Sequence, residues 1–185
     1  MLPKHSTSRL MQRKHHTPAR GRTKRRLDAP GASGPAHDRP VDDSDPFGLR
    51  RFVDAQGHSH DGIVRELRAA RKTSHWMWFV FPQVAGLGSS WVSQQFAIRS
   101  LDEARAYLAH PVLGPRLREC TDVVLAAPRD ATAASIFGGT DAMKLRSSMT
   151  LFLRAAPEEH RWQQVLNHFY GGVPDALTDR LLGLE

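Results

Sequence analysis

The residues best suited to chemistry lie in one aromatic segment, residues 72–83, which reads KTSHWMWFVFPQ. It holds two of the four tryptophans and two of the eight phenylalanines, beside His75 and Gln83. Trp76 and Trp78 can stack a ring or a sugar, while the imidazole and the amide bond its polar edges. Because an imidazole titrates near neutrality, His75 is a candidate catalytic acid or base. The alternative is that this segment forms the centre of the core, with its indole N–H groups bonded to the backbone.

A second group of polar residues lies at the start of a long helix, which we expect to begin at residue 140 or 141. Lys144 and Arg146 fall near its first turn, where the helix dipole disfavours cations. Either they pair with local carboxylates, or they form an anion site with the N-terminal amides of the helix. Ser147 adds a hydroxyl that bonds a backbone carbonyl or a ligand. The predicted ligand-binding residues are therefore Trp76, Trp78, Gln83, Lys144, Arg146 and Ser147.

Glu103 is the second candidate catalytic residue, as a general base. Its alternative role is in a capping box that begins at Ser100, where the hydroxyl and the carboxylate each satisfy a backbone donor. The sequence contains no HExxH motif, no carboxylate cluster at metal-ligand spacing and no glycine-rich phosphate loop. We therefore predict neither a metal site nor a cofactor.

The elements that must position these residues are helices, because apolar residues recur at helical spacing from residue 45 onward. Residues 72–92 interrupt this pattern and are expected to be extended or irregular. We predict an all-α, mainly helical globular domain of six to eight helices with at most a short extended segment. Six helices are expected at about 46–56, 100–110, 113–127, 130–137, 157–170 and 174–182. A further helix is expected to follow the first and to end at about residue 71, and the long helix is expected to begin at residue 140 or 141.

The charge of the chain is concentrated in its first part. Residues 1–40 contain ten Lys or Arg and two acidic residues, whereas residues 41–185 contain 16 basic and 17 acidic residues. The sequence pI of about 10.3 therefore reflects the first part alone. We predict that residues 1–44 are a disordered basic tail with a Pro/Gly linker, and that residues 45–185 form a single helical domain. Weak nucleic-acid contact through phosphate neutralisation is the alternative to a passive tail.

Cysteine usage and hydropathy bear on the location of the protein. A single cysteine, Cys120, cannot form an internal disulfide, and it lies in an apolar helical pattern typical of a buried thiol. No apolar run approaches the roughly 20 residues that cross a bilayer. We therefore predict a cytoplasmic protein without membrane contact. No pattern in the sequence predicts its oligomeric state.

Four stretches of the sequence resemble a bacterial family catalogued as a domain of unknown function, DUF1810. They read DPFGLRRFVDAQ, SHWMWFVFPQxxGLG, FAIRSLDEARAYLAHPVLGPRLREC and IFGGTDAMKLRSSMTLF, and the resemblance covers about residues 45–183. It implies a compact helical fold and no established activity. Members often carry the automatic label calpastatin, which nothing in this sequence supports, because calpastatin repeats are disordered inhibitors.

The order of the motifs is also similar, more distantly, to NADAR-like helical N-glycosidases, which process ADP-ribose and related ribosides. In those proteins an aromatic-rich stretch precedes a helix with a glutamate, and a later helix carries a basic residue and a methionine. The corresponding features here are residues 75–83, Glu103, and residues 146–149. This resemblance implies N-glycosidase-type hydrolysis.

Two classes of function follow, and the sequence leaves open whether the protein is an enzyme. In the first, the domain binds or processes a small polar ring compound, such as a nucleotide or an ADP-ribose-like molecule. In the second, it is a non-catalytic protein-interaction domain whose aromatic segment is only core. The first class predicts that the two polar motifs meet at one concave surface with their polar tips exposed.

Overall fold

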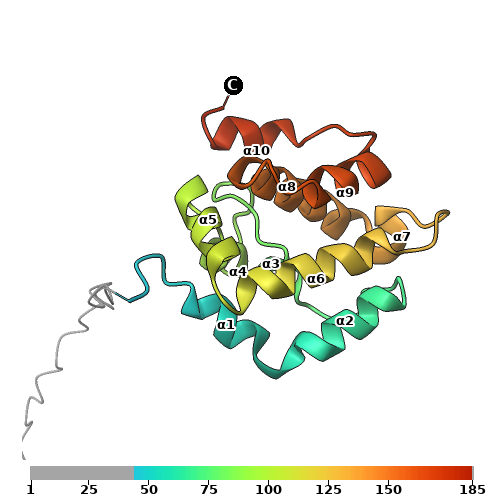
Figure 1. Ribbon diagram of the computed structural model, residues 1–185, viewed down its shortest axis with the longest axis horizontal. Coiled ribbons are helices and arrows are strands. Elements are labelled where there is room, and N and C mark those ends of the chain that lie inside the picture. The colour runs from blue at the N-terminus through green and yellow to red at the C-terminus, as the bar shows by residue number, and fades with distance from the viewer. Residues whose placement is uncertain (1–43, 185) are drawn as a thin grey trace, which may run out of the picture. The chain divides into compact units, whose positions relative to one another are not determined.

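The computed structural model describes residues 44–184, and this part of the chain is all-α (Figure 1). The predicted fold class is confirmed: within residues 44–184, the only β pairing is an isolated parallel bridge between Val84 and Ile98. The predicted basic tail lies outside the described residues, except for Ser44. No helix of the described chain is long and apolar enough to span a bilayer.

The helices are α1 (Arg50–Gln56), α2 (His60–Arg68), α3 (Met77–Val80), α4 (Trp91–Gln95), α5 (Leu101–Ala109), α6 (Leu113–Leu125), α7 (Ala133–Phe137), α8 (Gly139–Ala155), α9 (Arg161–Tyr170) and α10 (Ala176–Leu181), with a 3-10 turn, η1, at Gly57–Ser59. These are ten α-helices within residues 44–184, more than the six to eight predicted. The two additional helices are α3 and α4, single turns of four and five residues, whereas α7 falls in the stretch expected at 130–137. Such short pieces have too few residues to show a helical period.

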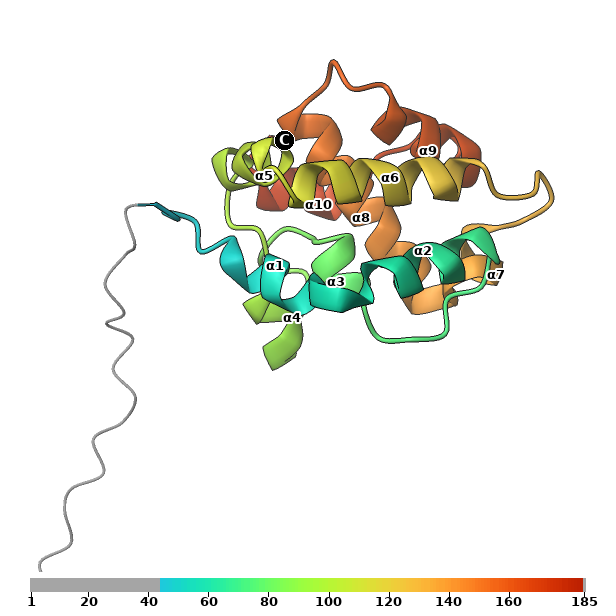
Figure 2. The ribbon, with the colours of Figure 1, turned by 60° about the horizontal axis from the view of Figure 1, so that its bottom comes forward.

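Helix α8 is the centre of the core. It packs against α5, α7, α9 and α10, and α6 lies between α2 and α9 (Figures 1 and 2). Leu145, Met149 and Phe152 of α8, which the sequence predicts to face inward, are fully buried. Ser148 and Leu151 are buried as well, so α8 is covered on most of its faces. A helix that is packed on several sides in this way holds its side chains in fixed positions.

Helix α1 begins four residues later than residue 46, where the sequence pattern places its start. The Asp45 carboxylate does accept backbone N–H groups, but from Leu49 at 2.6 Å and Arg50 at 2.9 Å. A turn separates Asp45 from the helix, and Gly48 adopts a φ of +63° in it. Asp45 therefore satisfies two backbone donors at the start of α1 without being its N-cap residue, which is Leu49, and the helix begins only at Arg50.

The loop between α2 and α3 is held by one carboxylate, that of Glu66. Its Oε2 accepts hydrogen bonds from the backbone N–H of Thr73 at 2.7 Å and of Ser74 at 3.1 Å, and from Trp76 Nε1 at 2.9 Å. The Ser74 hydroxyl donates to Oε1. Glu66 thereby orders the irregular segment that leads into the aromatic residues.

These contacts predict a pH dependence of stability. Burial by itself raises the pKa of the Glu66 carboxyl, but the hydrogen bonds from Ser74, Thr73 and Trp76 outweigh it and lower the pKa from 4.5 to about 2. Because the folded pKa lies below the unfolded one, this stabilisation is fully present above the unfolded pKa. It is lost as the pH falls toward the folded pKa. Glu66→Gln should therefore lower the urea midpoint clearly at about pH 7 and progressively less toward about pH 3.

Glu158→Gln is the matched control for this measurement. Glu158 is exposed and makes no hydrogen bond or ion pair within residues 44–184. Its replacement should leave the midpoint unchanged at both pH values. A gap between wild type and Glu66→Gln that stays constant with pH would contradict the role given to Glu66.

Candidate functional site

A cavity of about 370 Å³ lies where the aromatic segment meets α8 and the start of α10. We call it the Trp78 cavity. Its walls come from segments that are far apart in the chain, so it exists only in the folded domain. It is lined by Trp78, Gln83, Leu87, Gly88, Ser93, Thr140, Met143, Lys144, Ser147, Asp175 and Leu177.

Four of the predicted ligand-binding residues line this one cavity. Trp78 and Gln83 come from the aromatic segment, and Lys144 and Ser147 come from the first turns of α8. The two polar motifs of the sequence therefore meet at a concave surface. The other predicted site residues lie elsewhere.

Lys144 joins the two motifs directly. Its Nζ lies 4.1 Å from the centroid of the Trp78 ring, a cation–π contact, and 2.8 Å from Asp141 Oδ1. Lys72 Nζ lies 2.7 Å from the other carboxylate oxygen, so one carboxylate faces two ammonium groups. Burial by itself raises the pKa of Asp141, but hydrogen bonds from Lys144 and Lys72 lower it overall. The cluster keeps one excess positive charge beside the cavity.

The floor of the Trp78 cavity contains a chain of hydroxyl groups that ends at a carboxylate. Ser147 Oγ lies 2.7 Å from Thr178 Oγ1, which donates to Asp175 Oδ2 at 2.6 Å. The backbone N–H of Thr178 also donates to Asp175 Oδ2, at 2.9 Å, so Asp175 is the N-cap of α10. Within residues 44–184, both hydrogen bonds of this carboxylate use Oδ2. Oδ1 accepts no hydrogen bond from this part of the chain.

Sequence reasoning missed Asp175. The spacing of Asp175 and Thr178 is a recognisable helix-start signal, but it says nothing about a cavity. Met143 and Leu177, which are 68% and 46% exposed, were missed for a similar reason. An exposed apolar side chain indicates a binding site only when the structure shows that it borders a cavity.

Arg146 does not line the Trp78 cavity. Its Nε donates to the carbonyl of Val173 at 3.0 Å and its Nη2 to that of Pro174 at 3.1 Å. The guanidinium also lies 5.9 Å from the centroid of the Tyr170 ring. These contacts hold the segment between α9 and α10 against α8.

His75 and Trp76 belong to a different hollow, of about 590 Å³, which Glu66 and His58 also line. His75 is exposed, whereas Trp76 is 2% exposed and packs on Phe81 and Phe137 with ring centroids 6.2 and 6.3 Å away. Within residues 44–184, no three His, Cys, Asp or Glu side chains are grouped to hold a metal. The catalytic role of His75 and the ligand-binding role of Trp76 stay predictions.

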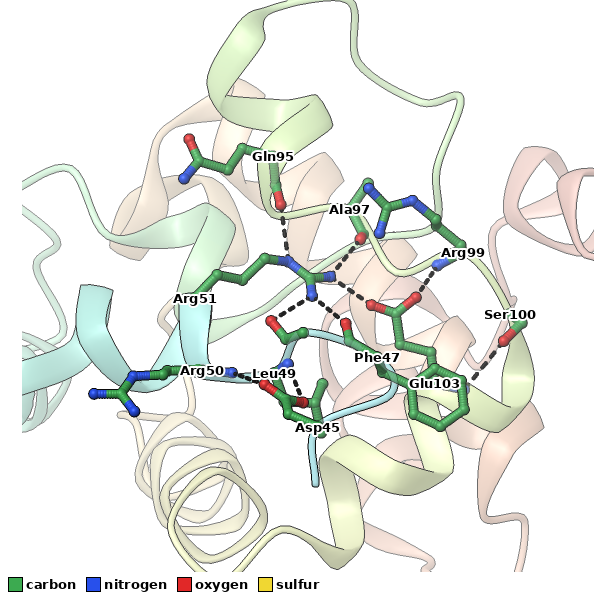
Figure 3. A network of polar contacts seen from close by, with 11 residues as sticks. Asp45, Phe47, Leu49, Arg50, Arg51, Gln95, Ala97, Arg99, Ser100 and Glu103 are labelled. Atoms are coloured by element: carbon green, nitrogen blue, oxygen red, sulfur yellow. Dashed lines mark hydrogen bonds and ion pairs between the residues drawn. The ribbon is translucent and has the colours of Figure 1, made fainter. Parts of the chain in front are cut away.

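Glu103 is 2% exposed and its carboxylate is occupied on both sides (Figure 3). One oxygen forms an ion pair with Arg51, and the other accepts the backbone N–H of Arg99 at 2.8 Å. Half of the predicted capping box is present: the Ser100 hydroxyl caps α5 by accepting the N–H of Glu103 at 3.1 Å, but the Glu103 carboxylate accepts the N–H of Arg99 instead of that of Ser100. Glu103 lines none of the cavities described above. Its predicted role as general base finds no support in this geometry.

The fold and the cavity together define a class of protein. It is a small all-α domain with a cavity between an aromatic segment and the central helix, and polar groups line the bottom of this cavity. The chain belongs to the family described as "Protein of unknown function (DUF1810)", whose profile matches residues 46–182. It is similar to the conserved hypothetical protein Rv1873 from Mycobacterium tuberculosis, known from a crystal structure. That likeness has 50% identity and a TM-score of 0.74, and covers 76% of this chain and 100% of the other.

A comparison with curated proteins found no match. The resemblance to the DUF1810 family is thus confirmed. The more distant resemblance to NADAR-like N-glycosidases stays a prediction.

Proposed function

We propose that this domain binds a small, planar, polar compound in the Trp78 cavity. The observation that carries the proposal is the meeting of Trp78 and Gln83 with Lys144 and Ser147 around one hollow of about 370 Å³. This volume is within the range of cavities that hold small ligands. The aromatic residue offers a face for stacking, and the amide, ammonium and hydroxyl groups offer hydrogen bonds around it.

The distribution of polar and apolar groups supports a ring with polar edges as the ligand. Met143 and Leu177 form an apolar rim, and Lys144 and Asp175 bring one charge of each sign to the interior. A nucleobase or a similar heterocycle has apolar faces, together with donors and acceptors in its plane. Such a compound can bury its faces against Trp78 and the rim while its edges bond the charged groups.

A hydrolytic version of this proposal is supported by Asp175. Cleavage of an N-glycosidic bond needs a group that activates water or stabilises positive charge on the sugar, and carboxylates serve in both roles. Asp175 and Lys144 are the charged side chains that line the Trp78 cavity. We propose Asp175, through its Oδ1, for this task. Asp175→Asn should then abolish release of the base, whereas binding of the intact compound should weaken only in part, because the amide keeps an acceptor oxygen at this position.

Binding is tested by tryptophan fluorescence and thermal shift with nucleosides, nucleotides and ADP-ribose compounds. A ligand at about 100 times its Kd raises the free energy of unfolding by about 2.7 kcal/mol if it binds only the folded chain. The fluorescence titration is best made in a Trp91→Phe chain, because Trp91 is 73% exposed and adds an unrelated signal. In this background, Trp78→Leu should weaken binding by about 5- to 150-fold through loss of stacking, by analogy with base–aromatic stacks of about 1–3 kcal/mol.

The parent Trp91→Phe chain is also the control, and it should bind as the wild type does. If no compound raises the unfolding midpoint, or if Trp78→Leu binds as tightly as its parent, the proposal is wrong. The interaction-domain hypothesis would then be the one to pursue.

A further inference from the structure

A second hollow, of about 230 Å³, adjoins the Trp78 cavity. The two share a wall made of Trp78, Gln83, Leu87, Gly88 and Ser93. Gly88 packs closely on Ser93 in this wall, because a Cβ at this position would lie 2.5 Å from Ser93 Oγ and 2.6 Å from Ser93 Cβ. We call the second space the Arg99 hollow, after the charged residue that lines it.

Arg99 sets the charge of this hollow. Among its lining residues within the described chain there is no Asp or Glu, and Arg99 is the only cation. The guanidinium has no ion pair or hydrogen bond to any residue from 44 to 184. Figure 3 shows that the contact of this residue with Glu103 is made by its backbone amide instead. The side chain is thus available to a ligand while the backbone is fixed.

The backbone of Arg99 is held in register with Gln83. The N–H of Ile98 donates to the carbonyl of Gln83 at 2.9 Å, and the N–H of Ala85 donates to the carbonyl of Ile98 at 2.8 Å. This bridge ties the end of the aromatic segment to the residue before Arg99. A ligand stacked on Trp78 and bonded to Gln83 would therefore have next to it the adjoining hollow, in which Arg99 has a fixed backbone and an unpaired guanidinium.

We infer that the ligand of the Trp78 cavity carries an anionic group, such as a phosphate, which Arg99 binds in the adjoining hollow. The inference rests on the proposed function and names its ligand class: a heterocycle with a negatively charged substituent. A guanidinium suits this task because it donates two parallel hydrogen bonds to a phosphate or a carboxylate. Gln94, which also lines the Arg99 hollow, brings a further donor to it, because its amide donates one of its two hydrogens to the Ser89 carbonyl at 3.2 Å and keeps the other.

The test compares pairs of compounds that differ by one phosphate, adenosine with AMP and uridine with UMP, on the full chain. We expect the phosphorylated member of a pair that binds to do so at least about tenfold more tightly, as expected for hydrogen bonds to charged groups. Arg99→Ala should remove this advantage and leave the affinity for the nucleoside within about twofold. Arg99→Lys should keep part of it, because an ammonium retains the charge without the paired donors.

Two controls separate Arg99 from the other cations of the chain. Arg129→Ala removes an exposed arginine that has no partner within residues 44–184 and lines neither hollow, so it should leave every affinity unchanged. The basic residues 1–40 are present in all variants, and they cannot account for a difference between Arg99→Ala and wild type. The urea midpoint of Arg99→Ala should match that of the wild type, since the contact with Glu103 uses the backbone.

The outcomes distinguish this inference from the proposal beneath it. If nucleoside and nucleotide bind equally and both need Trp78, the proposal that a planar compound binds the Trp78 cavity stands. The inference that Arg99 binds an anionic group of this compound is then wrong. An advantage of AMP that survives in Arg99→Ala would also overturn the inference. If inorganic phosphate stabilises the chain as much as AMP does, Arg99 binds free phosphate rather than a substituent of the ring compound. If neither member of either pair binds, and no other compound of the wider screen binds, both proposals fail.

Discussion

Arg51→Ala is expected to lower the free energy of unfolding by about 3–5 kcal/mol, the usual cost of leaving a buried charge without its partner. The Arg51 side chain is 15% exposed and that of its partner Glu103 is 2% exposed. The guanidinium also donates to four carbonyls, those of Phe47, Gly48, Gln95 and Ala97 (Figure 3). Its removal therefore leaves a buried carboxylate without its counter-ion and several carbonyls without this donor, and it removes the polar contacts that join α1 to α4 and α5.

The neighbouring residue provides a matched control. Arg50 forms an ion pair with Asp54 at 3.7 Å, but the two side chains are 85% and 66% exposed. Exposed pairs are screened by water, so Arg50→Ala should cost less than about 1 kcal/mol. Urea unfolding of both variants measures the two effects. Adding Glu103→Gln to Arg51→Ala should recover part of the loss, because it removes the unpaired charge.

An Arg51→Ala variant with a loss below about 1 kcal/mol would contradict this account. Glu103 would then not depend on Arg51 for its burial. The prediction that Glu103 acts as a general base would then need to be tested directly.

Trp76→Ala should also cost about 3–5 kcal/mol, through the lost burial of the indole and the cavity it leaves. The ring is 2% exposed and packs on Phe81 and Phe137, and its Nε1 donates to Glu66 at 2.9 Å. The truncation thus weakens the core and removes one of the hydrogen bonds that order the preceding loop. Thermal and urea unfolding report the combined effect.

Trp91→Ala and His75→Gln are the controls for this substitution. Trp91 is 73% exposed, so the same truncation there should change stability by less than about 0.5 kcal/mol. His75 precedes Trp76 but is exposed and makes no hydrogen bond within residues 44–184, so its replacement should leave stability nearly unchanged. Equal losses for Trp76→Ala and Trp91→Ala would show that the aromatic segment is not part of the core.

Helix positions could be predicted from the sequence because they depend on local patterns. The inward stripe of α8 follows from apolar residues at a spacing of three and four, and the cap at Ser100 from a hydroxyl before a helical pattern. The start of α7 was less predictable. The sequence pattern places this start at residue 130, where Asp130 offers a cap, but Thr132 caps the helix instead, in a capping box with Ser135. Neighbouring Asp and Thr residues offer competing caps, and local chemistry does not decide between them.

For residues 72–83, local sequence patterns do not predict which side chains are buried. Their side chains follow no single period, so nothing in the sequence separates exposed His75 from buried Trp76, or buried Trp76 from half-buried Trp78. Each of these positions depends on a contact with a distant element. Trp78 meets Lys144 of α8, and Trp76 reaches Glu66 of α2.

The sequence by itself determined that the chain has an all-α domain, where most of its helices lie, and which residue types were available for a site. Only the tertiary structure decided which of them meet. It joined Lys144 to Trp78 and added Asp175 to their cavity, whereas it paired Glu103 with Arg51, 52 positions away in the chain. The physical reason is that helical periodicity and capping are properties of neighbours in sequence, whereas a cavity or a buried ion pair depends on how whole helices pack.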